Sequence, residues 1–125
     1  MSKPLVYLAG GRDTEWREVL AKRWAESGAA ETFDPFVDSR QNAMYEFTQD
    51  DLSAIRRSAA VFGYCTYPKY TGMALEFGFA HALCIPIVYV PALPRVDSMM
   101  AAVSSAVFLD FDEAVNFLET RILNR

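Results

Sequence analysis

The feature that most constrains the fold of this chain is a set of short, continuous apolar runs that alternate with segments of helical spacing. The clearest runs are 4–9 (PLVYLA), 59–65 (AAVFGYC) and 85–90 (IPIVYV). Strands that are apolar on both faces are typical of a parallel sheet with helices on both sides. Two weaker segments, 32–36, which Pro35 breaks, and 107–109, complete a predicted sheet of five strands.

The segments between these runs have the spacing of helices. Helices are expected over 14–27, over 48–57 (with a start as early as Asn42), over 72–84 and after Asp110. In the first of them the large apolar residues fall on one predicted face: Trp16, Val19, Leu20 and Trp24. Strand and helix therefore alternate throughout. This predicts a single α/β domain over residues 1–125, a parallel five-stranded sheet with helices on both faces, flavodoxin-like or Rossmann-like.

Composition argues against several classes of partner. A chain of 125 residues that is 52% hydrophobic can form one compact core, and its net charge of -4 does not favour nucleic acid or an anionic membrane. No apolar run approaches the roughly 20 residues of a membrane span, and the N-terminus lacks a signal-peptide pattern. Cys65 and Cys84 lie in apolar surroundings without metal-ligand spacing. We expect two reduced, buried thiols in a cytoplasmic protein that has no metal site.

Glu76 is the strongest candidate for a functional residue. It is the only Asp, Glu, Lys or Arg between Lys69 and Arg95, in a helical segment that is otherwise apolar on every side. Such a helix is expected to be buried, and a lone buried carboxylate is costly unless it is paired. Near a helix start, the dipole and free N–H groups favour the ionised form that a covalent nucleophile needs. The structural alternative is a glutamate that caps its own helix or bonds to a neighbouring strand.

Other candidates lie where the crevice of such a sheet is expected, beyond the carboxyl ends of the strands. The turn Gly10-Gly11-Arg12 follows the first strand, and the helix after it offers its N-terminus to an anion. A tight turn without a ligand explains the glycines equally well. Because the turn is not a GxGxxG motif, it does not indicate NAD. The helix start at Gly72 and the preceding Tyr70, which could stack on a base, belong to the same edge.

Asp50 and Asp51 are the remaining acidic candidates. Thr48 and Asp51 match the helix-start pattern [ST]-x-x-[DE], which gives Asp51 a purely structural interpretation. Asp50 could simply be solvated. The spacing alone does not decide between these interpretations and a functional one.

Three segments together resemble the nucleoside 2-deoxyribosyltransferase family, over most of residues 4 to 90. They are Tyr7-Leu8-Ala9-Gly10-Gly11, Asp51-Leu52-x-x-Ile55, and Gly72-Met73-x-x-Glu76-x-Gly78-x-Ala80-x-Ala82 ahead of Pro86-Ile87. The Glu-x-Gly-x-Ala helix is the most specific of the three. The resemblance implies an enzyme of nucleotide metabolism or salvage that cleaves or exchanges an N-glycosidic bond without a cofactor.

The resemblance also implies roles for individual residues. Glu76 corresponds to the glutamate that attacks the anomeric carbon and forms a covalent glycosyl intermediate. Asp51 corresponds to the aspartate that orients the nucleophile and the sugar, and Tyr7 to a tyrosine that hydrogen-bonds the glutamate. The turn Gly10-Gly11-Arg12 resembles the 5′-phosphate site of the sibling deoxynucleoside-monophosphate N-glycosidases.

The sequence departs from the family just ahead of the catalytic helix. Deoxyribosyltransferases usually have a second aspartate there, engaged with the leaving base, whereas this chain has Tyr70-Thr71. A nucleoside 2-deoxyribosyltransferase is the first interpretation, and a nucleotide N-glycoside hydrolase is the alternative. Ribonucleotide substrates and modified bases are also open. A non-catalytic nucleotide-binding or sensing module is the rival from another class, against which the isolated charge of Glu76 argues.

We further expect a homodimer or a larger homo-oligomer. The residues Met73, Phe77, His81 and Cys84 are predicted to form one apolar stripe of the helix that carries Glu76, and Met44, Tyr45 and Phe47 add apolar surface nearby. Large exposed apolar patches usually mark interfaces. The alternative is that both segments pack on the sheet of their own chain. The family resemblance implies that a neighbouring subunit helps to close each pocket.

Overall fold

The computed structural model describes residues 3–13, 15–66, 71–91 and 95–124. Within these residues one parallel sheet is formed by β1 (Leu5–Gly10), β2 (Glu31–Phe33), β3 (Ala60–Tyr64), β4 (Ile87–Val90) and β5 (Ala106–Val107). The helices are α1 (Glu15–Ser27), α2 (Pro35–Asp38), α3 (Met44–Arg56), α4 (Thr71–Ala82), α5 (Ser98–Val103), α6 (Phe111–Phe117) and the π-helical η1 (Leu118–Leu123). The predicted fold class is confirmed. In this part of the chain, no helix combines the length and apolar character that crossing a membrane requires.

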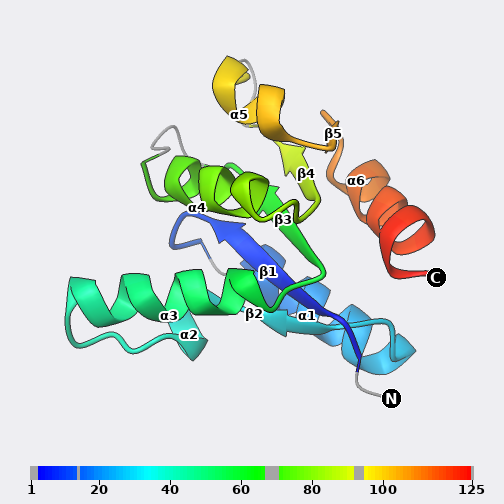
Figure 1. Cartoon of the computed structure of the whole chain (residues 1–125). Coiled ribbons are helices and arrows are strands. Elements are labelled where there is room, and N and C mark those ends of the chain that lie inside the picture. The colour runs from blue at the N-terminus through cyan, green and yellow to red at the C-terminus, as the bar shows by residue number, and fades with distance from the viewer. Residues whose placement is uncertain (1–2, 14, 67–70, 92–94, 125) are drawn as a thin grey trace.

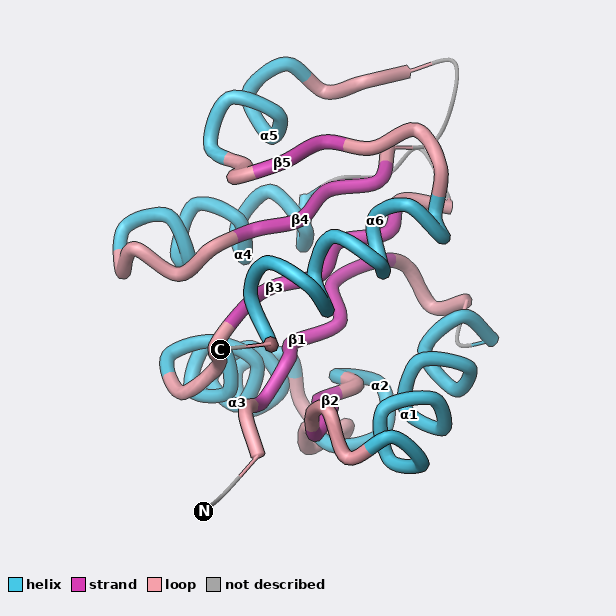
Figure 2. The backbone as a smooth tube through the Cα atoms, turned by 90° about the vertical axis from the view of Figure 1, so that its right-hand side faces the viewer, coloured by secondary structure: helices cyan, strands magenta, loops and turns pink. Residues whose placement is uncertain are grey.

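Helices cover both faces of the sheet. Figure 1 shows α3, α4 and α5 on one face, and the rotated view of Figure 2 shows α1 and α6 on the other. The strands supply both cores by alternation, because successive side chains point to opposite faces. In β1, Val6 and Leu8 belong to the core beneath α1 and α6, whereas Tyr7 and Ala9 belong to the core beneath α3 and α4.

The strand order β2-β1-β3-β4-β5 creates a crevice between β1 and β3. The chain leaves β1 through α1 on one face of the sheet and leaves β3 toward α4 on the other face. Adjacent strands whose connections diverge in this way leave room at their carboxyl ends, which is where open parallel sheets bind ligands. The carboxyl end of β1 is the Gly10-Gly11-Arg12 turn that the sequence indicated.

Pro35 begins a helix, whereas the apolar run 32–36 predicted a strand. The strand β2 already ends at Phe33, and the carboxylate of Asp34 accepts a hydrogen bond of 2.9 Å from the backbone N–H of Phe36. Proline suits the first helical position, since its missing N–H has no helical partner there. The short helix α2 that results places Phe36 beside the crevice.

The helix α3 begins at Met44, so the earlier of the two predicted starts is the better one. Thr48 and Asp51 therefore lie inside the helix. The interpretation of these two residues as a helix-start pattern is wrong, and Asp51 needs another explanation.

The helix α1 buries most of the predicted face, since Trp16, Leu20 and Trp24 are buried as expected. Val19 is the exception, because it is 56% exposed. Arg17, which the prediction did not include, is only 1% exposed and completes the buried face.

The helix α4 is buried on one face only, whereas its composition predicted burial all round. Phe77 lies so close to β3 that a Cβ at Gly63 would come within 2.4 Å of its ring. Met73 and Phe77 thus pack on the sheet and do not form an exposed stripe, while Leu75 on the outer face is 53% exposed. The C-terminal end of the helix also differs from expectation, because Cys84 is exposed.

Candidate active site

A cavity of about 1060 Å³ lies at the carboxyl end of β1, between the loop 10–13, α2, α3 and the start of α4. Six of the residues predicted for the site line it: Gly10, Gly11, Arg12, Asp51, Gly72 and Glu76. Tyr7 lies on β1 and hydrogen-bonds to Glu76. Tyr70 lies outside the described residues.

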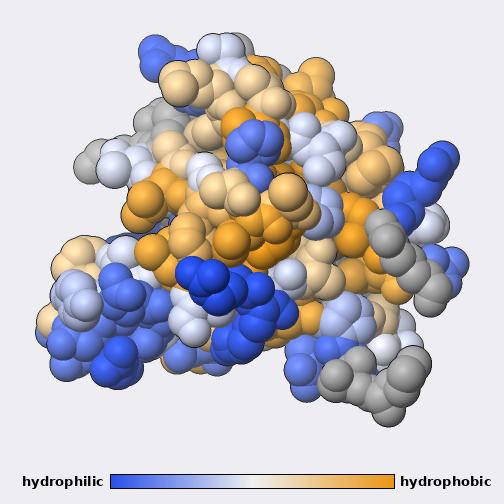
Figure 3. All heavy atoms as spheres, viewed as in Figure 1, coloured by the Kyte–Doolittle hydropathy of each residue, from blue (hydrophilic) through white to orange (hydrophobic). Residues whose placement is uncertain are grey.

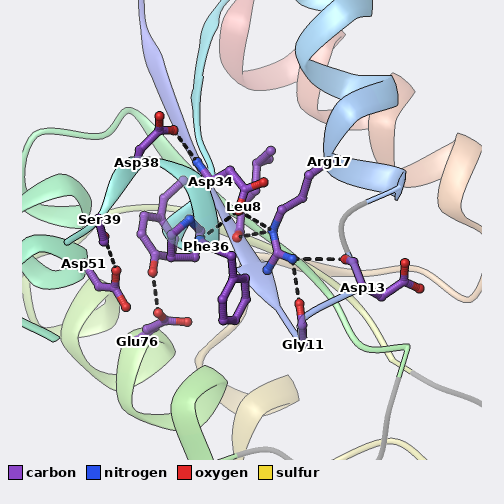
Figure 4. A network of polar contacts seen from close by, with 12 residues as sticks. Leu8, Gly11, Asp13, Arg17, Asp34, Phe36, Asp38, Ser39, Asp51 and Glu76 are labelled. Atoms are coloured by element: carbon purple, nitrogen blue, oxygen red, sulfur yellow. Dashed lines mark hydrogen bonds and ion pairs between the residues drawn. The ribbon is translucent and has the colours of Figure 1, made fainter. Parts of the chain in front are cut away.

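Glu76 reaches the cavity from the buried face of α4, where its side chain is 8% exposed. The packing of Phe77 on Gly63 holds α4 close to the sheet and brings Glu76 to β1. There the hydroxyl of Tyr7 donates a hydrogen bond to Oε2 of Glu76, drawn as the dashed line that ends at Glu76 in Figure 4. The carboxyl group that the sequence singled out therefore has a specific buried partner.

Burial controls the ionisation of this pair. It raises the pKa of Glu76 to about 8, with a further contribution from the negative charge of Asp51. The hydrogen bond from Tyr7 and the positive charge of Arg17 oppose this rise. The pKa of Tyr7 itself is raised far above its usual range, mainly by burial, so Tyr7 remains the donor. The expectation that a helix start keeps Glu76 ionised is wrong, because Glu76 lies beyond the first turn of α4 and its free N–H groups.

Asp51 brings a second carboxyl group to the cavity from α3. Its side chain is 5% exposed, and its Oδ1 accepts a hydrogen bond of 2.5 Å from the hydroxyl of Ser39. Burial raises the pKa of Asp51 to about 6, whereas the hydrogen bond from Ser39 and the nearby hydroxyl of Tyr7 lower it. The hydroxyl of Tyr7, which donates to Glu76, therefore also lies close enough to Asp51 to influence its pKa.

Asp50 turns away from this group. It forms an ion pair with Arg40, with 3.0 Å between Nη2 and Oδ1, and it does not line the cavity. The geometry therefore separates two adjacent aspartates that the sequence could not tell apart. Asp51 faces Tyr7 and Glu76, and Asp50 faces the preceding loop.

Arg17 is a site component that the sequence analysis missed. Its guanidinium donates to the backbone carbonyls of Leu8 (3.1 Å), Gly11 (2.6 Å) and Asp13 (3.1 Å), and it lies 3.6 Å from Asp34. These bonds fix the loop that lines one side of the cavity, as seen in Figure 4. Burial lowers the pKa of Arg17, while Asp34 and Glu76 raise it. A signal was present in the sequence, because Arg17 is spaced three and seven residues before Leu20 and Trp24.

Phe36 and Phe47 are aromatic side chains that the structure adds to the cavity wall, and their ring centroids lie 5.7 Å apart. Phe36 also contacts two cations. The guanidinium of Arg12 lies 5.1 Å from the centroid of the Phe36 ring, and that of Arg17 lies 5.0 Å from the same centroid. The ring therefore adds an apolar surface to a wall that also carries the positive charge of Arg12.

The arrangement has the components of nucleophilic chemistry. It offers two buried carboxyl groups, a tyrosine between them and a loop with a positive charge at its rim. Among the residues that the structure describes, no group of three His, Cys, Asp or Glu side chains could hold a metal ion.

The fold is similar to that of solved structures. No protein-family model matches the chain, and no curated protein matches it. The fold is similar to that of a 2-deoxyribosyltransferase from Bacillus psychrosaccharolyticus, with a TM-score of 0.68 and 21% identity over 90% of each chain. It is also similar to the CMP N-glycosidase of Clostridium botulinum, with a TM-score of 0.64 and 21% identity over 91% of this chain and 97% of that one. The family that the sequence resembles is therefore matched at the level of the fold.

Proposed function

We propose that this protein cleaves or exchanges the N-glycosidic bond of a nucleoside or nucleotide, with Glu76 as the nucleophile. The observation that carries the proposal is the convergence of Tyr7, Asp51 and Glu76, from three elements, on one cavity. The names of the two structural neighbours, a 2-deoxyribosyltransferase and a CMP N-glycosidase, support the same reaction class.

The proposed reaction has two steps, as in retaining glycosidases. An oxygen of ionised Glu76 attacks the anomeric carbon, the C–N bond breaks, and the base leaves with the electron pair and takes up a proton. The resulting glycosyl ester on Glu76 is then attacked by a second base or by water, which loses a proton and frees the carboxylate. Tyr7 holds the carboxyl oxygen that is not attacking, and Asp51 binds the sugar.

The loop at the rim is the proposed site for the 5′ end of the sugar. Gly10 and Gly11 let a ligand approach the backbone, and Arg12 supplies a positive charge for a 5′-phosphate. Gly72 lines the opposite wall at the start of α4. Tyr70, two positions earlier in the sequence, is the proposed contact for the base.

Base exchange is the favoured activity and hydrolysis the second candidate. Exchange requires that water be kept from the glycosyl ester. In the single chain Met44 and Leu75 line the cavity with exposures of 73% and 53%, which favours access of water. Figure 3 shows apolar atoms gathered over α4 on the same face. We therefore propose that a second copy of the chain covers this surface, and that exchange depends on that cover.

The test is incubation with a panel of nucleosides and nucleoside monophosphates, with and without an acceptor base. Exchanged nucleoside in the presence of acceptor identifies a transferase, and free base with no exchange identifies a hydrolase. Glu76→Ala is the control for background cleavage. Saturable binding without any turnover would identify a nucleotide-binding module and overturn the proposal.

A further inference from the structure

We infer that Ser39 is a positioning residue for the reaction, because its hydroxyl fixes one oxygen of Asp51 and leaves the other on the side of Tyr7 and Glu76. The inference rests on the function proposed above. Figure 4 shows the contact, with Ser39 on the side of Asp51 that is away from Glu76. The hydroxyl donates to Oδ1 of Asp51 over 2.5 Å, and Ser39 is only 4% exposed.

The contact uses the single donor of the serine between two residues that are almost fully buried. A hydroxyl has one proton to donate, and a hydrogen bond from it to a carboxylate is stronger than one between neutral groups. Ser39 follows the last residue of α2, with an extended backbone (φ -85°, ψ 155°) that carries the chain away from the helix. Its side chain is thereby turned toward α3.

Neighbouring contacts fix the register of this loop on α3. Arg40, one residue after Ser39, bonds to Asp50, one residue before Asp51. Its backbone N–H is 2.8 Å and its Nε 3.0 Å from Oδ2. The amide of Gln41 donates to the carbonyls of Pro35 (2.8 Å) and Ser39 (2.6 Å). Two consecutive loop residues thus hold two consecutive aspartates, which gives Asp50 a structural role and Ser39 a role at the cavity.

The hydrogen bond from Ser39 affects the ionisation of Asp51, because the other groups around this carboxyl have opposing effects on its pKa. Burial and the neighbouring charge of Asp50 raise the pKa of this carboxyl, while Ser39, Tyr7 and the charge of Arg17 lower it. Glu76 faces it from α4. Without Ser39, the carboxyl group would hold its proton to higher pH and could rotate away from the sugar. Either change removes the oriented carboxylate that the proposed reaction uses.

The test compares Ser39→Ala with a matched control, Ser58→Ala. Ser58 is a second buried serine, two residues after the end of α3, and its hydroxyl donates over 2.7 Å to the carbonyl of Ala54 and does not face the cavity. We expect Ser39→Ala to lower kcat roughly tenfold to hundredfold, as loss of a hydrogen bond to a charged group does, with a smaller change in KM. Ser58→Ala should lose stability and keep its kcat. Ser39→Thr keeps the hydroxyl and should restore most of the kcat.

A second readout does not depend on activity. Titration of the Asp51 carboxyl carbon by NMR should show a higher pKa in Ser39→Ala than in the wild type, and an unchanged pKa in Ser58→Ala. An unchanged Asp51 titration, or an equal loss of kcat in the two alanine variants, overturns the inference. If the wild type turns over substrate, Glu76→Gln does not, and Ser39→Ala keeps full kcat, this inference alone fails. A wild type inactive on every N-glycoside overturns the proposed function instead, and the positioning role with it.

Discussion

At the scale of single residues, the burial of Glu76 makes stability and activity depend on pH in opposite directions. Its pKa of about 8 in the fold exceeds the ordinary value of 4.5, so the folded state prefers the protonated form. The stability that this preference contributes is complete below about pH 4.5 and is lost as the pH rises through about 8. The attack on the anomeric carbon needs the ionised form, so kcat/KM should rise over the same range.

Glu76→Gln tests both consequences. The variant should lose N-glycosidic activity by several powers of ten, because an amide cannot form the glycosyl ester. Its thermal midpoint should match that of the wild type near pH 5 and exceed it by several degrees near pH 9, where the wild type carries a buried charge. Melting curves across this range decide it. Parallel curves for the two proteins would show that Glu76 does not titrate as its burial requires.

The two adjacent aspartates provide a second residue-scale prediction. Asp51→Asn should lower kcat at least tenfold more than Asp50→Asn, because only Asp51 lines the cavity and is linked to Tyr7. Asp50→Asn weakens the contacts with Arg40, which lie outside the cavity, so its cost should fall on stability more than on kcat. Steady-state kinetics of the two variants side by side measure the difference. Equal losses of kcat in the two variants would show that Asp51 has no special role in the reaction.

At the scale of elements, the sequence predicted those helices and strands whose apolar residues recur with a regular spacing. The strands β1, β3 and β4 and the helix α4 follow from apolar runs and spacing, and the crevice follows from the rule for parallel sheets. The short helix α2 was missed because the cap at Asp34 turns an apparent strand into a helix. The positions of Ser39 and Phe36 depend on that turn. They could not be predicted, since no periodic pattern connects this loop to α3.

The end of α4 gives the prediction at this scale. Cys84 has a positive φ of 59°, and the backbone N–H of Ile85 bonds to the carbonyl of Ala80 over 2.9 Å, which is the pattern of a helix end that favours glycine. Cys84→Gly should therefore stabilise the protein by about 1 kcal/mol. Gly28 ends α1 with a φ of 74° and has an open surrounding, so Gly28→Ala should destabilise it by about 1 kcal/mol. Urea unfolding of both variants checks the opposite signs. A less stable Cys84→Gly would mean that the thiol makes a favourable contact.

At the scale of the whole molecule, the exposed apolar surface and the open cavity have one common explanation. The helix α4, which has Leu75 exposed on its outer face, packs beside α3, where Tyr45 is 72% exposed. A monomer leaves this surface in water, whereas a two-fold dimer can bury it and shield the cavity from water at the same time. The residues Met73 and Phe77, on which the sequence-based expectation of a dimer partly rested, are buried within the chain.

We therefore predict that the protein is at least a homodimer at micromolar concentration, and that Tyr45→Glu dissociates it. Tyr45 does not line the cavity, so the variant tests the association and leaves the catalytic groups in place. Light scattering should give at least twice the chain mass of 14.0 kDa for the wild type and a single chain mass for Tyr45→Glu. The ratio of exchange to hydrolysis should fall in the variant, because water then reaches the glycosyl ester. A wild type with the mass of one chain would remove the proposed cover and leave hydrolysis as the activity that the open cavity favours.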